Sequence, residues 1–248
     1  MLATGNKSLT GYRLSIRFGA DGFSFSVCST LDGSVVQSDH FPVSEASPSD
    51  DVLRQALKKP YLMDYRFQSV ELVADTQATI VPLEHFNKGD MLAFYRLCFP
   101  STNGQWSLAD MQYQILPPVE AVMIFPVEQS LLRIVQECYP DVKVCSTDAQ
   151  QLELFASLQE KRPAPDDAEQ RDAYVSFEDR RFFVCIFRRS KLLYAGSQTA
   201  DNDNDRIFLL LGIWKALELN AQRDACHLQG ASKELQKTIG EYILNTDC

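Results

Sequence analysis

The chain has 248 residues, of which 45% are hydrophobic and 23% charged, and its formal net charge is −9. This composition excludes an intrinsically disordered protein and allows one large domain or two domains of about 100–150 residues each. The acidic balance argues against a nucleic-acid-binding protein, because such proteins need a basic surface to displace counterions from phosphates.

The cysteines and the apolar runs indicate a cytoplasmic protein without a membrane span. There are seven cysteines, an odd number, and no closely spaced pair of the kind that holds structural zinc. The first residues lack the apolar segment of a signal peptide. The longest apolar run, residues 207–211, is far shorter than the roughly 20 residues that a transmembrane helix needs.

The N-terminal segment predicts three antiparallel strands. Apolar and polar residues alternate over residues 12–18 and again over 23–28, which is the pattern of half-buried strands. Residues 19–22 (GADG) predict the turn between them. The pair Asp32-Gly33 predicts a second hairpin turn, with a third strand starting at Val35.

Helices and strands alternate through the middle of the chain. A helix is predicted to start at residues 47–51 and to stop at Pro60, which cannot continue it. Residues 61–67 (YLMDYRF) predict either a loop tucked onto the sheet or a surface loop with the aromatic, Met and Arg content of an interface. The other elements expected are strands at 69–74, 78–81, 106–116, 121–127 and 142–145, helices at 91–99 and 128–139, and a helix capped by Asp148.

A second meander follows a polar, proline-containing linker at residues 162–170. Residues 173–200 predict three short strands, and residues 206–219 predict a helix that is apolar on most sides and therefore buried. A strand at 225–228 and a helix at 233–244 complete the chain. The order predicts an α/β fold of duplicated ribonuclease H-like units (βββαβα), in a lobe with inserted elements at residues 1–162 and a lobe at 171–248.

This order resembles the actin-like superfamily, which includes actin, sugar kinases, heat-shock ATPases and the pilus-assembly actin-like proteins. Residues 121–155 (AVMIFPVEQSLLRIVQECYPDVKVCSTDAQQLELF) are similar to the strand-helix-strand segment of the pilus-assembly group. Residues 174–244 are similar to its second meander and terminal helix. The chain also looks like a bacterial family of unknown function with this fold. The resemblance implies an actin-like ATPase fold with two lobes.

In actin-like ATPases, phosphates bind at Asp-x-Gly-type turns between the first two strands of each half. The corresponding turns here are residues 18–22 (FGADG) and 177–180 (FEDR), and the adenosine-side turn is reduced to residues 228–232 (LQGAS). If a nucleotide cleft survives, the resemblance implies that its cofactor is ATP with magnesium; otherwise no cofactor, catalytic residue or metal ligand is expected. The residues implied to line such a cleft are Gly19, Asp21, Gly22 and Gly230.

Other groups of polar residues favour structural roles. Residues 201–205 (DNDND) have the carboxylate spacing of a calcium loop but lack the later Gly and Glu of an EF-hand, so they are expected to cap the next helix. His227 is expected to be a satisfied strand residue rather than a base. A two-metal nuclease would gather acids at strand ends. The acids in such positions, none in a close motif, are Asp21, Asp75, Glu178, Asp179 and Asp224.

We therefore expect a non-catalytic actin-like scaffold or interaction protein in the cytoplasm, with a protein partner or a second copy of itself and without nucleic acid. The alternative is a divergent ATP-binding enzyme of the actin-like and sugar kinase superfamily. A metal-dependent nuclease is a third hypothesis. A rise in melting temperature with ATP would favour the enzyme, and a response to divalent ions alone would favour the nuclease.

Overall fold

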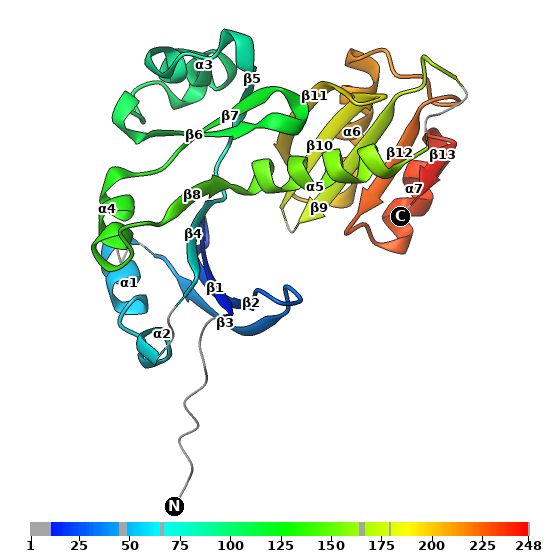
Figure 1. Cartoon of the computed structure of the whole chain (residues 1–248). Coiled ribbons are helices and arrows are strands. Elements are labelled where there is room, and N and C mark those ends of the chain that lie inside the picture. The colour runs from blue at the N-terminus through cyan, green and yellow to red at the C-terminus, as the bar shows by residue number, and fades with distance from the viewer. Residues whose placement is uncertain (1–10, 45–48, 65–66, 164–166, 179, 248) are drawn as a thin grey trace, which may run out of the picture. The chain divides into compact units, whose positions relative to one another are not determined.

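The structure is a computed structural model that describes residues 11–44, 49–64, 67–163, 167–178 and 180–247. The chain divides into two compact units, whose elements are labelled in Figure 1. The first unit comprises Met1–Gln77, Asn87–Gln114 and Ile124–Thr147. The second comprises Ala78–Phe86, Ile115–Met123 and Asp148–Cys248. The lobe boundaries expected from the sequence stay a prediction.

The first unit is built on a five-stranded sheet in the order β3-β2-β1-β4-β8. The strands are β1 (Tyr12–Gly19), β2 (Gly22–Ser29), β3 (Val35–Pro42), β4 (Ser69–Ala74) and β8 (Lys143–Ser146). The first three form the predicted antiparallel meander, β4 pairs parallel to β1, and β8 pairs parallel to β4. Leu14, Ile16 and Phe18 of β1 are buried at alternate positions, as the period of a strand requires.

Helices α1 (Ser49–Ala56) and α4 (Gln129–Cys138) pack against each other in the first unit. Arg54 of α1 donates a hydrogen bond of 3.0 Å to Glu137 of α4. The helix predicted at residues 128–139 is confirmed as α4, whose buried residues are Leu131, Leu132, Ile134 and Val135, whereas Cys138 is exposed.

Helix α1 ends before Pro60, as predicted, but the segment after it corrects the prediction of a loop. Pro60 begins a second short helix, α2 (Pro60–Asp64), because its fixed φ and missing N–H suit the first turn of a helix. The predicted loop at residues 61–67 is therefore helical as far as Asp64. Residues 65–66 of that segment lie outside the described part of the chain.

A separate three-stranded sheet has the order β5-β7-β6. Its strands are β5 (Thr79–Pro82), β6 (Met111–Leu116) and β7 (Ala121–Pro126). All residues of β7 are buried, as its continuous apolar run predicts. The strand predicted at residues 106–116 starts later than expected, because Ser107 and Asp110 form a capping box around the short 3-10 helix Leu108–Asp110.

The connections of this region are short helices. The predicted helix at residues 91–99 is confirmed as α3 (Met91–Cys98). The remaining 3-10 helices are Leu83–His85, Lys88–Asp90, Pro100–Thr102 and Pro117–Val119. None of the helices in the described part of the chain has the length and apolar character that a membrane span requires.

The second unit repeats the strand order of the first in a sheet with the order β11-β10-β9-β12-β13. Its strands are β9 (Asp172–Glu178), β10 (Arg181–Arg188), β11 (Lys191–Thr199), β12 (Ala225–Gln229) and β13 (Asn245–Asp247). Strands β9 to β11 form the predicted meander, and β12 pairs parallel to β9. The sequence missed β13, a strand of three largely exposed residues without an apolar pattern.

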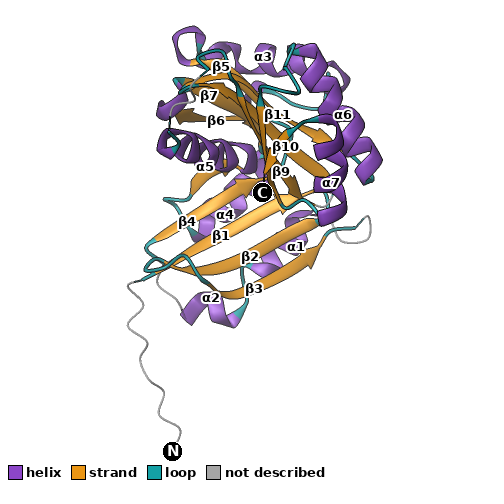
Figure 2. Cartoon of the chain, turned by 90° about the vertical axis from the view of Figure 1, so that its right-hand side faces the viewer, coloured by secondary structure: helices purple, strands orange, loops and turns teal. Residues whose placement is uncertain are grey.

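Helices cover both faces of the second sheet. On one face, α6 (Asp203–Ala216) and α7 (Lys233–Tyr242) pack on Phe182, Val184 and Ile186 of β10 (Figure 2). On the other face, Phe155 of α5 (Thr147–Lys161) stacks on Phe183. Because both faces are covered, β10 is buried at six successive positions instead of alternate ones.

Two predictions for these helices are wrong. Helix α6 is not buried on most sides, since only Leu210 and Trp214 are buried and Phe208 is 76% exposed. It lies on one face of a sheet, so only one stripe of its surface meets the core. Asp148 does not precede α5 as a cap but lies within it, where its buried carboxylate accepts a hydrogen bond of 2.6 Å from Arg181.

Candidate functional site

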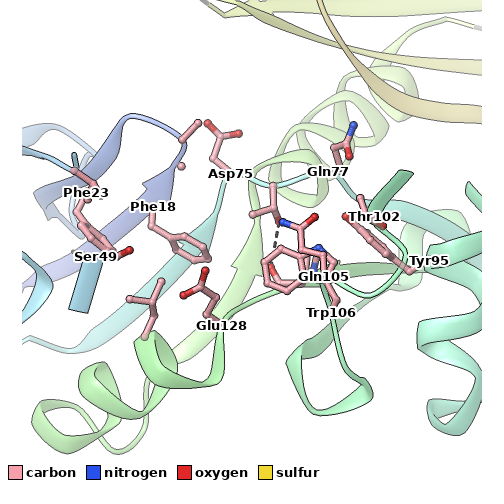
Figure 3. A pocket seen from close by; sticks show the side chains of 16 residues that line it. Phe18, Phe23, Ser49, Asp75, Gln77, Tyr95, Thr102, Gln105, Trp106 and Glu128 are labelled. Atoms are coloured by element: carbon pink, nitrogen blue, oxygen red, sulfur yellow. Dashed lines mark hydrogen bonds between the residues drawn. The ribbon is translucent and has the colours of Figure 1, made fainter. Parts of the chain in front are cut away.

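A pocket of about 320 Å³ opens in the first unit at the carboxyl ends of β1 and β4 (Figure 3). This edge is where open α/β sheets commonly bind their ligands. The walls come from five separate stretches of chain: the β1–β2 turn with its flanking residues, the residues around the start of α1, the end of β4, α3 with the segment after it, and the end of β7 with the start of α4. The lining residues are Phe18, Gly19, Ala20, Phe23, Val43, Ser49, Asp75, Thr76, Gln77, Tyr95, Thr102, Gln105, Trp106, Pro126, Glu128 and Leu131.

Hydrogen bonds between the strand ends fix the sheet side of the pocket. The N–H of Asp75 donates to the carbonyl of Phe18 at 2.8 Å, which joins the end of β4 to the end of β1. The carboxylate of Asp75 accepts from Arg17 at 2.8 Å. The Thr76 hydroxyl donates to the carbonyl of Pro126 at 3.2 Å, so the end of β7 is tied to the same edge.

The opposite wall consists of Tyr95 of α3 and of Thr102, Gln105 and Trp106 in the segment that follows it. Arg96 of α3 donates a hydrogen bond of 3.2 Å to the carbonyl of Trp106. The Thr102 hydroxyl donates to the carbonyl of Phe99 at 2.7 Å, and the ring of Tyr95 lies 4.8 Å from that of Phe99. These contacts fix the backbone of the segment that carries Trp106, although the segment is not a regular strand.

The pocket carries carboxylates and no basic side chain. Asp75 and Glu128 are its acidic residues, and none of the described residues that line it is Lys or Arg. Glu128 occupies the N-cap position of α4, but its side chain makes no capping hydrogen bond. Figure 3 shows Glu128 and Phe18 on one side, facing Gln105 and Trp106 on the other. The arrangement favours a positively charged group over a phosphate.

The predicted residues Gly19, Asp21 and Gly22 lie together in the tight turn between β1 and β2. Gly19 lines the pocket, whereas Asp21 and Gly22 do not. Gly22 has a φ of 128°, and a Cβ there would lie 2.2 Å from the carbonyl oxygen of Phe41. The fold therefore requires glycine at position 22 whether or not a ligand binds.

Gly230 lies in the second unit, directly after β12. Its φ is 74°, and a Cβ there would lie 2.5 Å from the carbonyl oxygen of Phe177. The close approach of the two backbones accounts for this glycine. The structure thus gives both Gly22 and Gly230 packing reasons, and their role in nucleotide binding stays a prediction.

Replacing Gly230 with Ala should lower the free energy of unfolding by about 1–3 kcal/mol, because a side chain is strained at positive φ and would collide with Phe177. Urea denaturation measures the change. Gly212 is the matched control, since it lies in α6 and a Cβ there meets nothing within 4 Å. Gly212→Ala should stabilise the chain by about 0.5–1 kcal/mol. Equal effects at the two positions would contradict this account.

The acidic residues that the nuclease hypothesis would need are not shown to form a metal site. Asp179 lies outside the described residues, and Asp224 is fully buried in an ion pair with Arg171. In the part of the chain that the structure describes, no group of three or more His, Cys, Asp or Glu is placed to hold a metal ion. The loop before α6 acts as predicted, because the Asn202 side chain accepts from the N–H of Asp205 and caps the helix.

His227 is part of a buried hydrogen-bonded cluster in the second unit. Its Nδ1 lies 2.5 Å from Asp247 and its Nε2 lies 3.3 Å from Asp172. Gln159 donates to Asp172 at 3.1 Å and accepts from the Tyr174 hydroxyl at 2.8 Å. Burial opposes ionisation of Asp172, but the hydrogen bonds from His227 and Gln159 prevail and lower its pKa. The prediction that His227 is a satisfied strand residue is confirmed.

Sequence reasoning missed most of the pocket. The sequence predicts an extended strand at Trp106 and indicates no role for Gln105 or Glu128. One local signal was present: Glu128 follows a continuous apolar strand at the start of a helix, which is the position of a ligand-facing side chain in α/β folds. No local signal connects Trp106 with the β1–β2 turn, about 85 residues earlier in the chain.

Comparison with known proteins agrees with the predicted fold. The family described as "Protein of unknown function (DUF3822)" matches residues 4–245. A crystal structure from Bacteroides thetaiotaomicron VPI-5482, a protein with an actin-like ATPase fold and unknown function, is 25% identical with a TM-score of 0.78. The match covers 100% of this chain and 93% of that one. No curated protein matches the sequence.

A second solved structure is the PilM-PilN type IV pilus biogenesis complex. Its matching chain is 13% identical with a TM-score of 0.52, and the match covers 95% of this chain and 87% of that one. These likenesses confirm the α/β fold of duplicated ribonuclease H-like units, the actin-like ATPase fold.

Proposed function

Since the chain belongs to DUF3822, a family of unknown function, we propose that it is a non-catalytic actin-like protein that acts as a scaffold or interaction protein in the bacterial cytoplasm. The observation that supports this proposal is the charge of the pocket at the β1–β2 turn. A triphosphate at that turn needs backbone N–H groups and cationic neighbours. The pocket offers Asp75 and Glu128 and no basic side chain among the described residues that line it.

The fold likeness to the PilM-PilN complex adds support for a role in binding proteins, because that relative was solved as an assembly with another protein. Our proposal includes either a protein partner or a second copy of the chain, and no nucleic acid. A formal net charge of −9 fits this choice, since an acidic surface repels phosphate backbones.

One observation favours the alternative, a divergent ATP-binding enzyme of the actin-like and sugar kinase superfamily. The carboxylates of Asp21 and Asp75 both lie about 3.4 Å from the position of a Cβ on Gly19. Two carboxylates beside a tight turn are ligands that Mg²⁺ accepts while it bridges to phosphate. Under this alternative, Gly19, Asp21, Gly22 and Gly230 would line a nucleotide cleft.

Thermal unfolding with Mg-ATP, Mg-ADP and MgCl₂ alone separates the two functions. We expect no change in melting temperature with any of the three. A bound nucleotide at one hundred times its dissociation constant would stabilise the chain by about 2.7 kcal/mol, which corresponds to a shift of several degrees. Such a shift with nucleotide, but not with MgCl₂, would overturn the non-catalytic proposal.

The interaction role has its own test. Light scattering on the purified chain shows whether it forms a dimer or larger assembly, and crosslinking in cells followed by purification shows whether a second protein is bound in fixed stoichiometry. We expect one of these complexes. A monomer that crosslinks to no protein would contradict the scaffold proposal even if nucleotide does not bind.

A further inference from the structure

We propose that the pocket at the β1–β2 turn binds a single cationic side chain, the guanidinium of Arg or the ammonium of Lys, presented by a protein partner. This inference rests on the proposed interaction function and names the chemistry of its contact. It follows from three properties of the described pocket: its carboxylates, its aromatic walls and its volume.

The carboxylates give the pocket its preference for positive charge. The Glu128 side chain is exposed and not used as a helix cap, so its oxygens are available at the pocket mouth. The helix N-terminus behind it carries about half a positive charge, which a full carboxylate outweighs. The Asp75 carboxylate is paired with Arg17, so Glu128 is the main source of the preference for positive charge.

The aromatic walls suit the flat or compact shape of a cationic head. Trp106 and Phe18 lie on opposite sides of the pocket, with Glu128 beside Phe18 (Figure 3). A guanidinium or ammonium near an aromatic face is attracted by the ring quadrupole, most strongly by that of Trp. Arg also stacks on aromatic rings and forms bidentate hydrogen bonds with carboxylates, so we expect Arg to bind more tightly than Lys.

The size and polar groups of the pocket fit one long side chain. A volume of about 320 Å³ is near the lower limit for small-molecule sites. The apolar parts of Phe18, Leu131 and Pro126 can cover the methylene stem of such a side chain. The amide of Gln105 can accept a hydrogen bond from the cationic head.

The test is titration of the full chain with N-acetyl-arginine amide and with its neutral isostere, N-acetyl-citrulline amide. The chain has two tryptophans, so Trp214→Phe leaves Trp106 as the fluorescent reporter at the pocket. Isothermal titration calorimetry on the unaltered chain provides a second measurement, independent of that variant. We expect saturable binding of the arginine compound that weakens as salt is raised, and at least tenfold weaker binding of the citrulline compound.

Two variants with the same change of charge locate the site. Glu128→Gln should weaken binding of N-acetyl-arginine amide by about tenfold or more, while Asp141→Asn, an exposed position before β8, should change it less than about twofold. Equal binding of the two compounds, no binding of either, or equal effects of the two variants would overturn the proposal.

A third arm distinguishes a partner's side chain from a free small cation. N-propylguanidine carries the same guanidinium and the same single positive charge without a peptide backbone. Tighter binding of N-acetyl-arginine amide supports a partner, and tighter binding of N-propylguanidine would overturn that part of the proposal. If a stoichiometric protein complex forms but Glu128→Gln leaves it intact, the proposal of a cation-binding pocket is wrong. The proposed interaction function is still supported in that case. Stabilisation by Mg-ATP would instead refute the function itself.

Discussion

Replacing Asp224 with Ala should lower the free energy of unfolding by about 3–5 kcal/mol, because it leaves a partly buried arginine without its partner. The Asp224 side chain is completely buried, and that of Arg171 is 17% exposed. The carboxylate accepts hydrogen bonds from the N–H and Nε of Arg171, at 3.0 and 3.1 Å. It also accepts from the N–H of Asn220 at 2.8 Å.

The pair joins three parts of the second unit. The guanidinium of Arg171 also donates to the carbonyls of Leu217 and Glu218, at the end of α6. These carbonyls have no partner within the helix, and Glu218 has a positive φ of 54°. Loss of Asp224 therefore disturbs the start of β9, the end of α6 and the turn into β12 at once.

Urea denaturation measures this effect, with Asp167→Ala as the control. Asp167 lies 3.9 Å from Arg223, which also contacts Asp224, but its side chain is 49% exposed. The control should cost less than about 1 kcal/mol, as exposed ion pairs do. A cost for Asp224→Ala no larger than that of the control would show that the buried pair is not a main support of the unit.

The strands of both meanders could be predicted because glycine-containing or charged turns separate short apolar or alternating runs. The segments at residues 12–18 and 69–74 were placed almost to the residue as β1 and β4. β10 was also found, although it is buried on both faces, because its turns mark its ends. These signals are local, and local hydrogen bonding decides where a strand turns.

Features that depend on tertiary packing, such as which sides of a helix are buried, could not be predicted from local sequence. The apolar run of α6 suggested burial on most sides, yet Phe208 faces away from the core because one sheet and α7 meet only part of the helix. Helix α1 ends before Pro60, as predicted, but the start of α2 at Pro60 is not predicted, because proline is compatible with both stopping and starting a helix.

The candidate site was the least predictable feature. The sequence pointed to the β1–β2 turn, and Gly19 does line the pocket. The residues that give the pocket its chemistry, Trp106 and Glu128, come from segments that share no spacing rule with that turn. Trp106 and Glu128 meet only because of the fold, so the acidic, aromatic pocket is visible only in the structure, beside the turn at which the resemblance implies phosphate binding.

Replacing Phe155 with Ala should destabilise the chain by about 3–5 kcal/mol, the usual cost of removing a buried aromatic side chain. Phe155 is 2% exposed and attaches α5 to one face of the second sheet. Its ring stacks on Tyr174 of β9 at 5.3 Å and on Phe183 of β10 at 6.4 Å. Stacked pairs of this kind contribute about 0.5–1.5 kcal/mol beyond the area that they bury.

The loss of stability in Phe155→Ala should exceed that of the cavity left by the missing ring, because Phe155 lies one turn of α5 from Gln159. The side chain of Gln159 accepts from Tyr174 and donates to Asp172, so α5 holds the buried polar cluster around His227 in place. Burial raises the pKa of Tyr174 to about 12, since its phenolate would be poorly solvated there. If α5 loosens in Phe155→Ala, the pKa of Tyr174 should fall toward the ordinary value of about 10.

Urea denaturation gives the stability, and absorbance titration of the tyrosines gives the pKa. Leu154→Ala is the control on the same helix, because Leu154 is 43% exposed and its truncation should cost less than about 1 kcal/mol. The expected result is a large loss for Phe155→Ala with a lowered Tyr174 pKa, and neither change for Leu154→Ala. A stable Phe155→Ala chain would mean that the core formed with α6 and α7 supports this sheet without α5.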